Sequence, residues 1–213
     1  ILHSNGLAQV EVINAGIPGH ATFDAFGRFY AEGHLLRPDY VVLYSAWNDI
    51  KCFREKDPLL RVVRPHEKDP RARTYGWIDG LLSRHSQIYY RLKVAYFDWK
   101  FRIGKEGAMP RDEGNAQIQD AALRQYKLNV ELFTDCARDI GAVPVLVTEG
   151  RLVSRDNTED ERKRIPYRYV QFDHDTLCKA FDDADRIMKD VAHSKNVPLV
   201  DAAKELSGCR ECF

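Results

Sequence analysis

Short apolar runs alternate along this chain with longer segments whose apolar residues recur every three or four positions. The short runs are typical of buried strands, and the longer segments of amphipathic helices. Strands are expected at 10–14, in the run that starts at Tyr40, at 143–148 and at 197–201. Helices are expected at 23–36, 77–103, 116–140 and 173–193. Thr22 is expected to cap the first of these helices.

The order of these segments predicts the fold class. Strands that alternate with helices form parallel sheets through right-handed crossovers. We therefore expect an α/β fold, with a three-layer, flavodoxin-like parallel sheet and helices on both faces. Residues 1–213 are expected to form a single domain, because 213 residues of which 44% are apolar suffice for one sizeable core.

One region, at about 51–110, interrupts this alternation. It opens with a charged stretch that contains Pro58, Pro65 and Pro70 and that predicts an irregular loop. The aromatic-rich helix expected at 77–103 follows. This helix is predicted either to pack on two sides or cover the sheet edge, or to act as a lid over an acyl or sugar pocket. The region is thus predicted to be a helical insertion or lid within the domain.

The net charge and the hydropathy of the chain argue against several classes of partner. Lys and Arg together number 32, as do Asp and Glu, so the net charge is zero. No overall field favours a nucleic acid or an anionic membrane. No apolar run approaches the roughly 20 residues of a transmembrane helix, and no targeting segment is retained. A soluble chain is expected, while the compartment and the oligomeric state are not specified.

Cysteines and common motifs indicate no metal or cofactor. The five cysteines are scattered and odd in number, which does not indicate a disulfide framework. Cys209 and Cys212 have redox or half-zinc spacing but lack a second pair. Dinucleotide, P-loop, zinc-protease and nucleophile-elbow motifs do not occur. We therefore expect neither a cofactor nor a metal site.

Candidate chemistry lies at the ends of the first two strands. The run that starts at Tyr40 stops on Trp47, Asn48 and Asp49, and the strand at 10–14 runs into a glycine-rich turn that ends at Gly19. Ligands of open α/β sheets bind beyond the carboxyl ends of strands. A carboxamide there can direct N–H donors into a crevice. Both segments also admit a plain turn without function.

These blocks resemble the SGNH, or GDSL-type, family of ester hydrolases. The matching blocks are Asn-Ala-Gly-Ile-Pro-Gly at 14–19, Pro-Asp-Tyr-Val-Val-Leu at 38–43 running into Asn48-Asp49, and the strands at 141–148 and 197–201. The resemblance covers nearly the whole chain except the insertion.

The resemblance implies a serine nucleophile and an acyl-enzyme mechanism. It places Gly19, through its backbone N–H, and Asn48, through its amide, in the oxyanion hole. A tetrahedral oxyanion needs such preorganised donors. Asp49 is expected to hold the loop through hydrogen bonds to backbone N–H groups. The substrate implied is a small-molecule ester or an acylated sugar.

The family's catalytic blocks are not found where the pattern requires them. No Gly-Asp-Ser precedes the strand at 10–14, and no Asp-x-x-His follows the strand at 197–201. Asp190 and His193 have that spacing but lie before the last strand. We expect a domain truncated at both ends, with its nucleophile and Asp/His outside the chain, so the chain alone is predicted to be inactive. Ala46 stands where the family usually has glycine.

Two alternatives remain open. One is a non-catalytic SGNH-like binding module, for example for carbohydrate, which the missing nucleophile and base favour. The other is an unrelated flavodoxin-like domain that binds phosphate or flavin at the strand ends, although no phosphate loop supports it.

Overall fold

The chain folds as an α/β protein, which confirms the predicted class. The computed structural model describes residues 10–56, 77–103, 116–206, 209 and 212. Its three strands are β1 (Tyr40–Tyr44), β2 (Val143–Val147) and β3 (Leu199–Val200). They form one parallel sheet in the order β1-β2-β3. The helices are α1 (Thr22–Leu36), α2 (Trp47–Ile50), α4 (Trp77–His85), α5 (Gln87–Ile103), α6 (Asp120–Asp139), α7 (Glu159–Arg164), α8 (Tyr167–Val170), α9 (His174–Lys195) and α10 (Ala202–Glu205).

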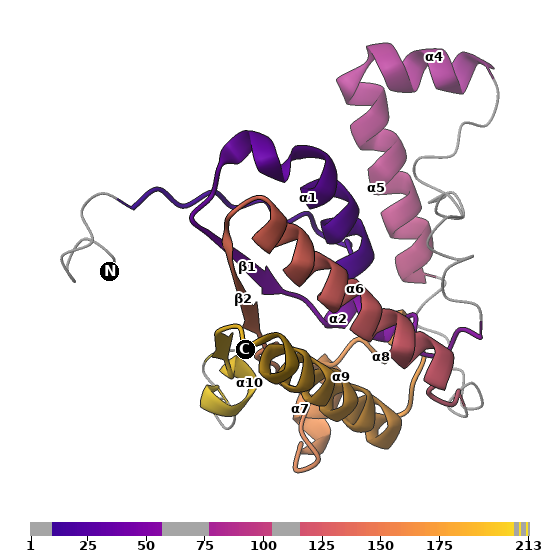
Figure 1. The fold of residues 1–213 in the computed structure, drawn as a ribbon. Coiled ribbons are helices and arrows are strands. Elements are labelled where there is room, and N and C mark those ends of the chain that lie inside the picture. Colours follow the sequence, from indigo (N-terminus) through magenta and orange to yellow (C-terminus); the bar gives the residue numbers. More distant parts are fainter. Residues whose placement is uncertain (1–9, 57–76, 104–115, 207–208, 210–211, 213) are drawn as a thin grey trace.

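Helices α6 and α9 cover one face of this sheet, and α1 packs beside α6 (Figure 1). The chain passes from β1 through α6 to β2, and from β2 through α9 to β3. Because parallel crossovers are right-handed and the strand order follows the chain, both crossover helices lie on the same face. Leu43 of β1 pairs in register with Leu146 of β2, and both are buried in the core beneath these helices.

The opposite face of the sheet remains open in the described part of the chain. Tyr40 and Val42 of β1 are 66% and 60% exposed, and Tyr44 is also exposed. Leu43, which lies between Val42 and Tyr44 in the sequence, is only 3% exposed. Val143 of β2 and Val200 of β3 are also exposed. Side chains alternate between the faces of a strand, so this pattern identifies one buried and one uncovered face. The helical cover predicted for both faces is therefore seen on one face among the described residues.

Residues 10–14 do not form the predicted strand. They are irregular, and Val10, Val12 and Ile13 are exposed. A strand is stabilised by backbone hydrogen bonds to a neighbour, and no described strand lies beside this segment. The glycine turn that follows does form, with a hydrogen bond of 3.2 Å from the N–H of His20 to the carbonyl of Ile17.

The long helices end where the sequence predicts. Gly141 has a φ of +84° just after α6, and Asn196 has a φ of +49° at the end of α9. The side chain of Asp173 accepts a hydrogen bond from the N–H of Thr176 and caps the start of α9. Thr22, in contrast, is not the predicted cap of α1, because Ala21 occupies that position and Thr22 is the first helical residue.

The helix expected at 77–103 is broken into α4 and α5. Ser86 separates them, and its hydroxyl accepts a hydrogen bond from the N–H of Tyr89 at the start of α5. The ammonium of Lys93 lies 2.7 Å from the carboxylate of Asp79, which ties the two helices together. The pair projects away from the sheet in Figure 1. Most of the predicted proline-containing loop lies outside the described residues, and the lid role stays a prediction.

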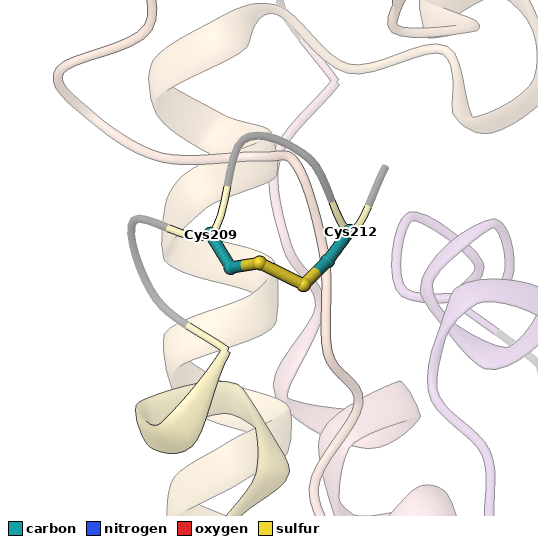
Figure 2. Close-up of a disulfide and its surroundings, with 2 residues drawn as sticks. All are labelled: Cys209 and Cys212. Carbon is teal, nitrogen blue, oxygen red and sulfur yellow. A yellow bond between two sulfur atoms is a disulfide. The ribbon is translucent and has the colours of Figure 1, made fainter.

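The cysteines near the end of the described chain are paired. Cys209 and Cys212 form a disulfide, with Cα atoms 5.4 Å apart (Figure 2). Cys52, Cys136 and Cys178 are free thiols. Cys209 and Cys212, which have a redox-type spacing in the sequence, are therefore oxidised to a disulfide.

Two features are absent from the residues that the structure describes. None of their helices is long and apolar enough to span a bilayer. No group of three or more His, Cys, Asp or Glu side chains among them is arranged to hold a metal ion.

Candidate functional site

Helix α2 begins directly at the carboxyl end of β1 and carries Asn48 in its first turn. Its N-cap, Ala46, has no polar side chain, and the carboxylate of Glu149 takes over the capping role. An oxygen of Glu149 accepts a hydrogen bond of 2.6 Å from the N–H of Trp47. Glu149 follows β2, so a residue at the end of β2 fixes the start of α2, the helix that follows β1. Ala46 has a φ of −158° and a ψ of −40°, outside the left-handed region that favours glycine.

The carboxamide of Asn48 faces the turn that contains Gly19. Its Nδ2 donates a hydrogen bond of 2.8 Å to the carbonyl of His20, the residue after Gly19. Its Oδ1 accepts a hydrogen bond of 2.5 Å from the hydroxyl of Tyr169. The structure thus brings Asn48 beside the turn that holds Gly19. The oxyanion-hole role of both residues remains a prediction.

Gly19 is required by backbone conformation. Its φ is +86°, which L side chains rarely adopt, while a Cβ built on it would meet no heavy atom within 4 Å. The turn is further held by Asn14, whose Oδ1 accepts a hydrogen bond of 3.0 Å from the N–H of Gly16. The glycine therefore shapes the turn, and it is exposed to solvent.

Asp49 fastens this loop to the rest of the fold, as expected from the sequence. Its carboxylate accepts hydrogen bonds from the N–H and hydroxyl of Thr22 and from the hydroxyl of Ser45. Burial raises the pKa of Asp49 to about 6, although these donors favour the ionised form and oppose the rise. The side chain is 6% exposed and faces away from solvent, so its role is to hold α2 against α1.

A small pocket lies beside α2 at the same edge of the sheet. Its volume is about 170 Å³. It is lined by Trp47, Glu149, Gly150, Arg151, Leu152, Val153, Arg164, Ile165 and Pro166. The guanidinium of Arg151 is not free to meet an anion there, because it pairs with Asp185 at 2.7 Å and lies 4.5 Å from the ring centroid of Phe181.

A stack of three aromatic rings lies next to Asn48. The ring of Trp47 stacks on Tyr169, with centroids 6.1 Å apart and planes at 3°, and on Phe181, with centroids 5.7 Å apart. Phe181 is fully buried on α9. The stack thus connects the core of the protein to the Tyr169 hydroxyl that contacts Asn48.

His174 and Cys178 have structural positions. The Nε2 of His174 lies 3.0 Å from the carbonyl of Ser154, which can only accept, so Nε2 carries the proton. Its Nδ1 then accepts from the hydroxyl of Tyr167 at 2.8 Å. The thiol of Cys178 lies 3.7 Å from Nε2, and burial raises the pKa of this thiol. His174 is therefore not placed to activate Cys178.

Sequence reasoning missed two residues of this site. Glu149 directly follows the strand predicted at 143–148, so the strand-end rule that led to Asn48 also applies to it. Tyr169 lies in α8, between that strand and the helix predicted at 173–193, and no local pattern distinguishes it.

The chain matches no protein-family model, no curated protein and no solved structure. The resemblance to SGNH hydrolases therefore depends on the sequence blocks alone.

Proposed function

We propose that this chain provides the oxyanion-binding part of a serine ester hydrolase that acts on a small ester or an acylated sugar. The observation that supports the proposal is the position of the Asn48 carboxamide. It lies at the carboxyl end of a parallel strand, 2.8 Å from a carbonyl of the turn that carries Gly19. A carboxamide and a backbone N–H beside one another are the donors that a tetrahedral oxyanion needs.

The geometry leaves one donor of Asn48 for this purpose. A carboxamide has two N–H bonds, and the structure assigns one of them to the carbonyl of His20. The remaining N–H is the one that would meet the oxyanion. The mechanism requires serine attack on the ester carbonyl, an acyl-enzyme, and deacylation by water that a histidine activates. In this proposal, the serine and the histidine lie in sequence outside these 213 residues.

The test compares esterase activity of Asn48 variants. The chain is expressed together with the sequence that flanks it in its gene, and p-nitrophenyl acetate hydrolysis is measured. We expect Asn48→Ala to lower kcat about 100- to 1000-fold, the usual cost of one oxyanion donor. Asn48→Asp preserves the shape of the side chain but presents oxygen to the oxyanion, so an equal or larger loss is expected. Circular dichroism and urea unfolding of both variants exclude a folding defect. Unchanged turnover in both variants would overturn the assignment.

A non-catalytic module that binds an acylated sugar is the second candidate. The observation that favours it is that the hydroxyl of Ser45, at the carboxyl end of β1, donates its hydrogen bond to Asp49 at 2.9 Å. A flanked protein that hydrolyses no p-nitrophenyl ester, yet binds acetylated oligosaccharide with an affinity that Asn48→Ala reduces, would establish this candidate.

A further inference from the structure

We infer that Lys51 and Tyr169 form a hydrogen-bonded relay that orients and polarises the carboxamide of Asn48. This inference rests on the proposed function. The ammonium of Lys51 lies 3.2 Å from the hydroxyl oxygen of Tyr169, and that hydroxyl lies 2.5 Å from Oδ1 of Asn48. Both are positioning residues, because neither occupies the place of the oxyanion.

The direction of every hydrogen bond in the relay follows from its two ends. The carbonyl of His20 can only accept, so the amide nitrogen of Asn48 must face it and Oδ1 must face Tyr169. An ammonium can only donate, so Lys51 donates to the oxygen of Tyr169. The hydroxyl proton of Tyr169 is then directed toward Asn48. A flipped amide would place Oδ1 of Asn48 against the carbonyl oxygen of His20. Two acceptors cannot form a hydrogen bond with each other, so this orientation is disfavoured.

The position of Tyr169 is fixed by packing rather than by the hydrogen bond alone. Its ring is stacked on Trp47 with planes nearly parallel. The next residue, Val170, is fully buried in the core, and Gln171, with a φ of +60°, ends α8 directly afterwards. The hydroxyl is therefore held in place before any ligand binds, as preorganised catalysis requires.

Lys51 adds a charge to this end of the relay. Its ammonium also lies 5.3 Å from the ring centroid of Tyr169, within the range of a cation–π interaction. A donor that is itself hydrogen-bonded to a cation donates more strongly, and hydrogen bonds in a chain polarise one another. Electron density moves toward Oδ1, which makes the N–H groups of Asn48 better donors to an oxyanion.

The first experiment observes the amide and needs no activity. Side-chain NH₂ signals are recorded in ¹H–¹⁵N spectra, and the pair that Asn48→Asp removes belongs to Asn48. We expect Tyr169→Phe to shift this pair and to increase its hydrogen exchange, while Tyr30→Phe, at an exposed tyrosine, leaves it unchanged. An Asn48 pair with the same shifts and exchange in Tyr169→Phe would overturn the inference, whatever the enzyme does.

The second experiment measures turnover in the flanked protein. Tyr169→Phe preserves the ring stack and is expected to lower kcat about 2- to 10-fold with little change in KM, the effect of one hydrogen bond used in the transition state. Lys51→Met should lower kcat in the same direction, Lys51→Arg should restore most of it, and Lys163→Met on α7 is the control. In an Asn48→Ala background, Tyr169→Phe should have no further effect.

These outcomes separate the two proposals. If Asn48→Ala abolishes turnover but Tyr169→Phe and Lys51→Met do not lower it, the relay is wrong and the proposed function stands. If Tyr169→Phe lowers kcat equally with and without Asn48, the two residues act independently and the relay is again wrong. If Asn48→Ala leaves turnover unchanged, the proposed function fails, and the NMR measurement alone decides whether the relay exists.

Discussion

The carboxylate of Asp49 accepts a hydrogen bond of 3.0 Å from the backbone N–H of Thr22, which lies 27 residues earlier in the chain. The hydroxyl of Thr22 donates to the same carboxylate at 2.9 Å. Both residues are buried, and they join the start of α1 to the turn that carries Asn48. The glycine turn leads directly into α1, so this contact sets how the two parts of the candidate site approach one another.

Stability should decrease as pH rises through the titration of Asp49. Burial raises the pKa of Asp49 to about 6 from an ordinary value of 3.8. Between these values the folded chain holds a proton that the unfolded chain has lost, so the free energy of unfolding falls as pH rises and levels off above about pH 7. At about 1.4 kcal/mol per pH unit, the loss is on the order of 3 kcal/mol.

Urea unfolding between pH 4.5 and pH 7.5 measures this loss, and Asp49→Asn provides the comparison. Burial also raises the pKa of Glu149 and of Asp185, so the wild-type curve contains their contributions in the same direction. The Asp49→Asn curve should fall less steeply over the same range. Parallel curves for the two proteins would show that Asp49 does not titrate as described.

Alanine substitutions at two glycines of α1 should change the stability of the protein in opposite directions. A Cβ on Gly33 would lie 2.3 Å from the ring of Phe29, which packs on Phe133 with ring centroids 5.1 Å apart. We expect Gly33→Ala to destabilise the protein by about 1–3 kcal/mol through overpacking. A Cβ on Gly27 meets nothing within 4 Å, so Gly27→Ala should stabilise the helix by up to about 1 kcal/mol. Thermal unfolding of the two variants tests the prediction, which fails if both shift the midpoint in the same direction.

Removing the carboxylate of Glu149 should loosen the start of α2. Glu149→Ala leaves the N–H of Trp47 without its acceptor, and loss of a helix cap typically costs about 0.5–2 kcal/mol. Glu149→Gln retains an oxygen acceptor and should cost less. Hydrogen exchange of the Trp47 amide provides the local measurement, with faster exchange expected in the alanine variant. Equal exchange rates in wild type and Glu149→Ala would contradict this capping role.

Thiol titration should distinguish the paired from the free cysteines. The unreduced chain, denatured in guanidinium, should present three thiols to Ellman's reagent, from Cys52, Cys136 and Cys178. Reduction beforehand should raise the number to all five cysteines of the sequence. Cys212→Ser should present four thiols without reduction, because Cys209 loses its partner. Five thiols in the unreduced wild type would show that the disulfide does not form.

The strand predicted at 10–14 does not form, which shows that a local sequence pattern does not by itself specify a strand. Its apolar residues have the composition of a strand, yet a strand exists only through hydrogen bonds to a neighbour. The helix expected at 77–103 shows the same limit, since its periodicity continues across Ser86 where the backbone breaks. The position of Asn48 beyond β1 is predictable from sequence because a buried strand ends at the point where an apolar run stops.

By itself, the sequence determined the α/β class, strands β1 and β2, helices α1, α6 and α9, and the glycine turn beside Asn48. These features depend on apolar periodicity and on residues such as Gly141 that adopt particular backbone angles, and both are properties of short segments. Only the tertiary structure decided which groups surround Asn48. Tyr169 is 121 residues from Asn48, and Glu149 is 102 residues from Trp47. Contacts over such separations depend on how the crossover helices pack on the sheet, which no local pattern specifies.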